Sequence, residues 1–205
     1  MSYRSYRGDN IAPILAIIIL CFLVYIATIL PHFLDFLNYN LVELFGLQPA
    51  TFIHMPWTIV TNLFVHDPSS PWHLIFNMLT LYFFGTFLIR LVRTRTFLVI
   101  YFLGGIVGNI FVWLLQMHSY IPVIGASGAI FALGGTLAVL TPRLRVYAFP
   151  IPVPMPLWVA VIGGFIILAL ASGFLSISWQ GHLGGLVTGL LAGLILRRGV
   201  RTPLS

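Results

Sequence analysis

Six long apolar segments take up most of the chain, and they limit its possible folds more than any other feature. They cover residues 11–30, 73–91, 96–117, 123–141, 156–173 and 179–196. Each is close to the ~20 residues that a helix needs to span a bilayer. The chain is 60% hydrophobic and 7% charged, whereas an average soluble domain is about 25% charged. We therefore predict an all-α, polytopic membrane protein, with a single domain over 1–205 and a six-helix bundle over about 11–196.

The arginines predict how these segments cross the membrane. All ten basic residues are arginines: Arg4, Arg7, Arg90, Arg93, Arg95, Arg143, Arg145, Arg197, Arg198 and Arg201. They occupy the termini and the connections after the second and fourth segments, while the other three connections have neither arginine nor lysine. Cytoplasmic connections are enriched in these residues. Both termini are therefore expected in the cytoplasm, and the second, fourth and sixth segments run inward from the outer face.

Two polar residues lie where membrane helices tolerate few. Ser127, in the Gly-Ala-Ser-Gly motif of 125–128, is near the start of the fourth segment, and His182 is near the start of the sixth. At 1.5 Å per residue, both are expected roughly 6–8 Å below the outer surface. A hydroxyl and an imidazole are costly there unless they are hydrogen bonded or functional. Together they supply a nucleophile and a general base.

Small residues predict that the fourth and sixth segments touch. The sixth has glycine at every fourth position, and the fourth offers small residues at the same spacing: Gly181, Gly185, Gly189 and Gly193 against Gly128, Ala132 and Thr136. Such spacing lets transmembrane helices approach closely, which would bring Ser127 within reach of His182. Most patterns of this kind serve packing alone, and by itself this one favours packing.

A second polar pair starts the second segment. His73 and Asn77 are four residues apart, so both lie on one face of a helix. Taken separately, such a pair could cap its helix or bond an adjoining loop. The two pairs nevertheless come from three inward-running segments and share the outer leaflet, which favours a common site.

In these motifs the sequence resembles the rhomboid family of intramembrane serine proteases. The match covers the six-helix core, and its motifs are His-Leu-Ile-Phe-Asn at 73–77, Gly-Ala-Ser-Gly at 125–128 and Gly-His at 181–182 followed by Gly185 and Gly189. The resemblance implies that Ser127 is the nucleophile and His182 its general base. It also implies that His73, Asn77 and the backbone N–H of Ser127 stabilise the oxyanion.

The resemblance further implies residues that support the site. Phe131, one turn after the serine, would pack on the catalytic histidine, and His66 would support the site from the loop over 31–72. Four glycines would shape the surrounding backbone: Gly125, Gly128, Gly185 and Gly189. The family commonly has Trp-Arg in this loop where the present chain has Trp57-Thr58, which leaves open how the loop is braced.

The expected function is hydrolysis of a peptide bond in single-pass or polytopic transmembrane proteins, near the outer face of the membrane. The acids are Asp9, Asp35, Glu43 and Asp67. None lies in the last five segments, so a Ser-His dyad is expected rather than a triad. We expect membrane lipid as surroundings and neither cofactor nor metal. Nucleic acid is not expected, because the arginines form no basic stripe. The compact chain suggests a prokaryotic plasma membrane, and its oligomeric state is not readable.

Other functions remain open. A transporter or channel could use the outer polar cluster, but the inner halves of the segments contain almost no polar residues. A metal site could draw on four histidines, His66, His73, His118 and His182, although their spacing matches no compact ligand motif. A silent relative that only binds transmembrane partners would be expected to lack Ser127 or His182. Both are present, so a protease is favoured.

Overall fold

The computed structural model describes residues 10–32, 34, 39–147, 152–175 and 177–197. Within this part of the chain, the long helices are α1 (Ala12–Ile29), α4 (Pro71–Leu91), α5 (Thr94–Leu115), α6 (Ser127–Leu140), α7 (Leu157–Ala171) and α8 (Trp179–Leu196). Each corresponds to one predicted segment. The protein is thus mostly helical, as predicted.

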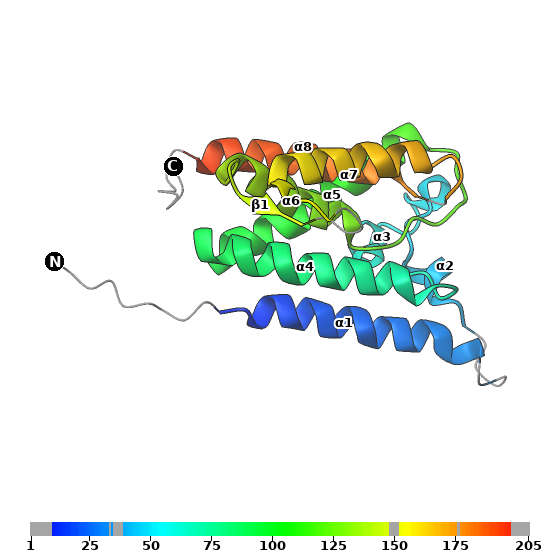
Figure 1. Ribbon diagram of the computed structural model, residues 1–205. Coiled ribbons are helices and arrows are strands. Elements are labelled where there is room, and N and C mark those ends of the chain that lie inside the picture. The colour runs from blue at the N-terminus through cyan, green and yellow to red at the C-terminus, as the bar shows by residue number, and fades with distance from the viewer. Residues whose placement is uncertain (1–9, 33, 35–38, 148–151, 176, 198–205) are drawn as a thin grey trace.

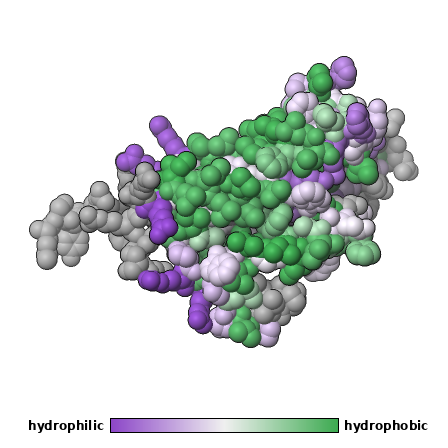
Figure 2. All heavy atoms as spheres, turned by 90° about the horizontal axis from the view of Figure 1, so that it is seen from above, coloured by the Kyte–Doolittle hydropathy of each residue, from purple (hydrophilic) through white to green (hydrophobic). Residues whose placement is uncertain are grey.

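Four of these helices, α1, α4, α5 and α8, are long and apolar enough to cross a membrane. The other two, α6 and α7, are apolar but have only 14 and 15 residues. Hydrophobic side chains cover the middle of the visible face, with hydrophilic ones gathered toward its two ends (Figure 2). The chain is therefore an integral membrane protein.

Short elements join the long helices. The connection between α1 and α4 contains η1 (Leu30–His32), α2 (Leu41–Phe45), η2 (Pro49–Thr51), α3 (Thr58–Thr61) and η3 (Asn62–Phe64). Between α6 and α7, the strands β1 (Arg145–Val146) and β2 (Met155–Pro156) pair antiparallel. Asn40 starts α2 as a side-chain cap, because its Oδ1 accepts hydrogen bonds from the backbone N–H groups of Val42 and Glu43.

Helix α6 is the centre of the bundle. Ten of its fourteen residues are buried, whereas α7 buries only Leu157 and Val161. Helices α1 and α4 lie side by side at one edge of the bundle, and the start of α1 and the end of α8 are at the same end of the molecule (Figure 1). Four of the arginines used to predict orientation are outside the described residues: Arg4, Arg7, Arg198 and Arg201.

The fourth segment was expected to be helical from 123, but α6 begins only at Ser127. The preceding backbone is hydrogen bonded to the loop between α1 and α4, because Val123 and Leu47 exchange two backbone hydrogen bonds of 2.8 and 2.9 Å. Gly125 has a φ of +111°, which glycine adopts readily and a helix does not. Pairing with the loop therefore delays the helix, and Ser127 becomes its first residue.

Glycines bring the backbones of α6 and α8 together, as their spacing predicted. A Cβ atom on Gly185 would collide with the carbonyl oxygen of Gly128, and one on Gly189 with that of Ala132. Thr136 Oγ1 of α6 also donates a 3.0 Å hydrogen bond to the Gly189 carbonyl. Side chains larger than hydrogen on this face would push the two helices apart.

Candidate active site

Close packing of α6 and α8 joins the two residues singled out by the sequence. Ser127 is the first residue of α6, and His182 lies in the first turn of α8. The Ser127 Oγ and His182 Nε2 atoms are 2.7 Å apart, a short hydrogen-bond distance. His182 is 6% exposed. A nucleophile and a base at this distance can pass a proton directly.

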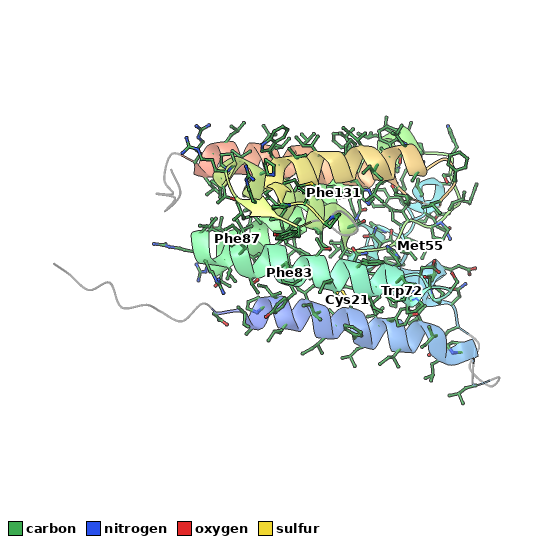
Figure 3. The ribbon with its side chains drawn as sticks, in the orientation of Figure 1. Cys21, Met55, Trp72, Phe83, Phe87 and Phe131 are labelled. Atoms are coloured by element: carbon green, nitrogen blue, oxygen red, sulfur yellow. The ribbon has the colours of Figure 1, made fainter. Side chains whose placement is uncertain are left out.

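An aromatic ring fixes one face of the histidine. Phe131, one turn after Ser127, lies with its ring centroid 4.7 Å from that of His182. Figure 3 labels Phe131 within the bundle. The same Phe131 ring meets Phe165 of α7 edge-on at 6.2 Å. Among the described residues, His182 Nδ1 has no hydrogen-bond partner. Packing on Phe131 and the hydrogen bond between Nε2 and Ser127 therefore orient the imidazole together.

His73 at the start of α4 faces the backbone just before Ser127. Its Nδ1 accepts a 3.3 Å hydrogen bond from the backbone N–H of Asp67, so the neutral ring carries its proton on Nε2. That Nε2 would lie 2.8 Å from a Cβ built on Gly125. A side chain at Gly125 would therefore block the imidazole N–H, which points toward the backbone of the serine motif.

Asn77 is buried on the same face of α4, one turn later. Its Nδ2 donates a 2.7 Å hydrogen bond to the His73 carbonyl, which uses one of its two amide hydrogens. Its Oδ1 is buried without a partner among the described residues. One donor of Asn77 thus remains available near His73, as an oxyanion stabiliser requires.

The start of α6 adds backbone donors to the site. The N-cap residue Ala126 gives no side-chain hydrogen bond, and the first N–H groups of a helix have no acceptor within it. The first helical bond runs from the N–H of Ile130 to the Ala126 carbonyl. In the described part of the chain, the N–H groups of Ser127 and Gly128 thus have no acceptor within α6 and can bind developing negative charge, which the helix dipole also favours.

His66 lies beneath His73 rather than beside the serine. It is fully buried, and its ring centroid is 5.2 Å from that of His73. The pKa of His66 is lowered to about 3, mainly by burial and then by nearby His73, while a 3.3 Å contact with the Phe64 carbonyl partly opposes this shift. His66 is thus a neutral ring that packs against His73, and its role as a supporting residue stays a prediction.

The loop is braced by its own hydrogen bonds where the family commonly has arginine. Trp57 Nε1 donates to the Leu44 carbonyl at 3.0 Å, and Thr58 Oγ1 donates to that of Met55 at 2.6 Å. Thr61 Oγ1 also reaches the Phe45 carbonyl at 2.9 Å. The Trp57 and Thr61 bonds hold the start and end of α3 against α2, and the Thr58 bond is local to the start of α3.

The histidines do not gather as a metal site would require. Within the described ranges, no three His, Cys, Asp or Glu side chains are close enough to share a metal ion. His118 lies exposed in the turn after α5, away from the buried pair of His66 and His73. The structure therefore does not assemble the alternative metal site.

Two buried residues near the site were missed from the sequence. Asn62 and Asn109 are 1% and 5% exposed, and their side chains bond each other. One signal was available, because Asn109 is an amide within the apolar segment of 96–117, and polar groups inside membrane helices are commonly functional.

Comparisons with known proteins agree on one family. Residues 54–199 match the model of the Rhomboid domain. The chain is 32% identical over 149 residues to Rhomboid protein 1, mitochondrial, of Saccharomyces cerevisiae, covering 70% of this chain and 42% of that protein. It is 34% identical over 143 residues to Rhomboid protease GluP of Bacillus subtilis, covering 68% of this chain and 26% of that protein. The chain thus spans less than half the length of these relatives.

Proposed function

The chain belongs to the rhomboid family, and from that premise we propose that it is an intramembrane serine endopeptidase. The observation that carries the proposal is the 2.7 Å distance between Ser127 Oγ and His182 Nε2. It is supported by the similarity to a Bacillus subtilis relative, Rhomboid protease GluP, which is named as a protease. In this proposal Ser127 is the nucleophile and His182 the general base.

The first half of the reaction forms an acyl-enzyme. His182 Nε2 takes the Ser127 proton as Oγ attacks the scissile carbonyl carbon. The oxyanion then accepts hydrogen bonds from the Ser127 N–H, His73 Nε2–H and the free amide hydrogen of Asn77. As the carbon–nitrogen bond breaks, His182 gives its proton to the leaving amine. Each donor of this kind is typically worth about 10²–10³-fold in rate.

The second half consumes one water. His182 takes a proton from water as the water oxygen attacks the acyl carbon. The same donors then hydrogen bond the second oxyanion. Collapse breaks the bond to Ser127 Oγ, and the proton returns from His182 to the serine. The net reaction converts one peptide bond and one water into a carboxylic acid and an amine, which become carboxylate and ammonium in neutral water. General-base help of this kind contributes about 10²–10⁴-fold.

We propose that all six long helices cross the membrane, with both termini cytoplasmic. Helix α6 has 14 residues, so it is about 21 Å long at 1.5 Å per residue. That falls roughly 9 Å short of a ~30 Å hydrocarbon core. A short α6 would start below the outer surface, with the non-helical backbone of 118–126 lining a water-filled cavity. Irregular backbone at that depth is tolerated where it lines such a cavity or is buried in protein.

The proposed substrates are single-pass or polytopic transmembrane proteins. A serine attacks an extended peptide, so cleavage is expected near the outer end of a transmembrane helix weakened by glycine, serine or proline. The prokaryotic plasma membrane stays a prediction, because the relatives include a mitochondrial protein of yeast as well as one of Bacillus subtilis.

The test is cleavage of a model transmembrane substrate by the full chain in liposomes. Wild type should release a defined fragment, and Ser127→Ala and His182→Ala should release none while keeping the wild-type thermal midpoint. Ser172→Ala is the matched control, because Ser172 Oγ only bonds the Ala169 carbonyl at the end of α7. Cleavage that survives Ser127→Ala would disprove the proposed mechanism.

A further inference from the structure

The geometry points to Asn62 and Asn109 as positioning residues, which hold the backbone before Ser127 in its catalytic conformation. This inference rests on the proposed function and adds to it a pair of side chains outside the reacting groups. Asn62 begins η3 in the loop after α1, and Asn109 lies inside α5. Neither touches Ser127 or His182 through a hydrogen bond in the described structure.

The two amides bond each other in both directions. Asn62 Nδ2 donates to Asn109 Oδ1 at 3.0 Å, and Asn109 Nδ2 donates to Asn62 Oδ1 at 2.7 Å. Asn109 Nδ2 uses its second hydrogen on the Ile59 carbonyl, 2.7 Å away. Asn62 and Asn109 are both buried, and an unpaired amide would be costly there. The reciprocal pair therefore fixes the position of Asn62 relative to α5.

Asn62 in turn hydrogen bonds the backbone just before the Gly-Ala-Ser-Gly motif of 125–128 and at its first residue. Its backbone carbonyl accepts a 2.9 Å hydrogen bond from the N–H of Gly125. Its side-chain Nδ2 also reaches the Val123 carbonyl at 3.4 Å. One residue thus holds the backbone on both sides of Ile124, just before Ser127. Gly125 has the φ of +111° and packs against His73, so its orientation sets how the oxyanion donors face one another.

The same helix also contacts the histidine side of the site. A Cβ on Gly108 of α5, next to Asn109, would lie 2.6 Å from the carbonyl oxygen of Gly181. Gly181 directly precedes His182 in α8. Helix α5 therefore touches the backbone beside the base and, through Asn109 and Asn62, holds the backbone beside the nucleophile. The asparagine pair thus supplies the hydrogen bonds by which α5 holds the backbone before Ser127.

The size of the effect follows from how sensitive catalysis is to position. Misplacing reacting groups by about 1 Å can lower a rate about 10²-fold. Replacing the two asparagines removes the bonds that hold Asn62, so its backbone carbonyl and the Gly125 peptide bonded to it can shift. The substrate-binding surface stays in place. The expected signature is a kcat that falls 10- to 100-fold with KM changed less than about twofold.

The experiment compares Asn109→Leu with the double variant Asn62→Leu/Asn109→Leu in the full chain. Leucine keeps the branched shape without polar atoms. The single change leaves the amide of Asn62 unpaired and should lower both the thermal midpoint and kcat. Replacing both partners can be nearly neutral for stability, so the double variant should regain much of the midpoint while kcat stays low. A purely structural role would restore both together.

Thr58→Val is the matched control. Thr58 is 1% exposed in the same loop, and its Oγ1 bonds the Met55 carbonyl rather than the serine motif. The control should lower the thermal midpoint and leave kcat unchanged. The inference is overturned if Asn109→Leu keeps the wild-type kcat, if the double variant regains kcat, or if Thr58→Val loses as much kcat at the same midpoint.

Amide hydrogen exchange separates this inference from the proposed function. The Gly125 amide should exchange slowly in wild type and at least tenfold faster in Asn109→Leu, whether or not a substrate is cleaved. A wild-type protein that cleaves nothing would disprove the protease and leave this measurement standing. Equal exchange rates at Gly125 in both proteins would overturn the positioning role.

Discussion

The sharpest prediction concerns one methyl group between α6 and α8. In Gly185→Ala, the new Cβ would strike the carbonyl oxygen of Gly128 and lie 2.8 Å from its carbonyl carbon. Ordinary contact begins near 3.4 Å, so the helices must separate by at least about 0.6 Å at this point. Gly128 follows Ser127 directly, and Gly185 is one turn after His182. The separation therefore lengthens the 2.7 Å Ser127–His182 contact.

We expect kcat for a transmembrane substrate to fall roughly 10- to 100-fold, and overpacking to cost about 1–3 kcal/mol of stability. Both are measured on purified protein, by initial cleavage rates and thermal unfolding. Gly164→Ala in α7 is the control, since a Cβ there meets nothing within 4 Å, and it should keep full activity. A Gly185→Ala variant with wild-type kcat and midpoint would refute the close approach.

Three further perturbations probe the surroundings of the site. Phe131→Ala removes the ring that packs on His182, so kcat should fall at least tenfold, whereas Phe131→Tyr should keep most activity in the same cleavage assay. His66 has a pKa of about 3 in the fold and an ordinary value of 6.5, so the unfolded chain binds more protons between those values and stability falls as pH drops below about 6.5. The loss in unfolding free energy is up to about 1.4 kcal/mol per pH unit. Between about pH 7 and about pH 5, the thermal midpoint of His66→Gln should therefore fall less than that of wild type. An equal fall in the midpoints of the two proteins would contradict this. Trp57→Phe removes the hydrogen bond to the Leu44 carbonyl and should lower the midpoint without abolishing cleavage.

Much of the fold could be predicted because lipid leaves few choices. An apolar stretch in a bilayer must satisfy its backbone internally and so becomes a helix. The segment predicted at 179–196 coincides with α8. The packing of α6 on α8 also followed from sequence, because glycine every four residues creates one smooth face. The two close approaches at Gly185 and Gly189 are on that face.

The start of α6 could not be predicted, because it depends on a partner far away in the chain. Residues 123–126 are apolar enough to read as helix, yet Val123 pairs with Leu47 and Gly125 bonds Asn62. Local sequence does not reveal such long-range hydrogen bonds. Asn62 itself escaped notice for the same reason, since its importance comes from Asn109, 47 residues away.

The proposed catalytic residues could be recognised in the sequence, whereas the orientation of their neighbours could not. Ser127 and His182 stand out because polar groups are rare in membrane helices. The tautomer of His73 required the Asp67 backbone contact, which no pattern predicts. The bracing of the loop by Trp57 and Thr58 likewise depends on carbonyls whose positions only the folded chain defines.

The most direct test of the account is covalent labelling of the purified protein by a fluorophosphonate, read by intact mass and peptide mapping. Attack of the serine oxygen on the phosphorus of this reagent needs an activated serine but no matched peptide substrate. The account predicts a single adduct on Ser127 in wild type, no adduct in Ser127→Ala, and labelling at least 100-fold slower in His182→Ala. An adduct on another residue, or undiminished labelling without His182, would contradict the dyad.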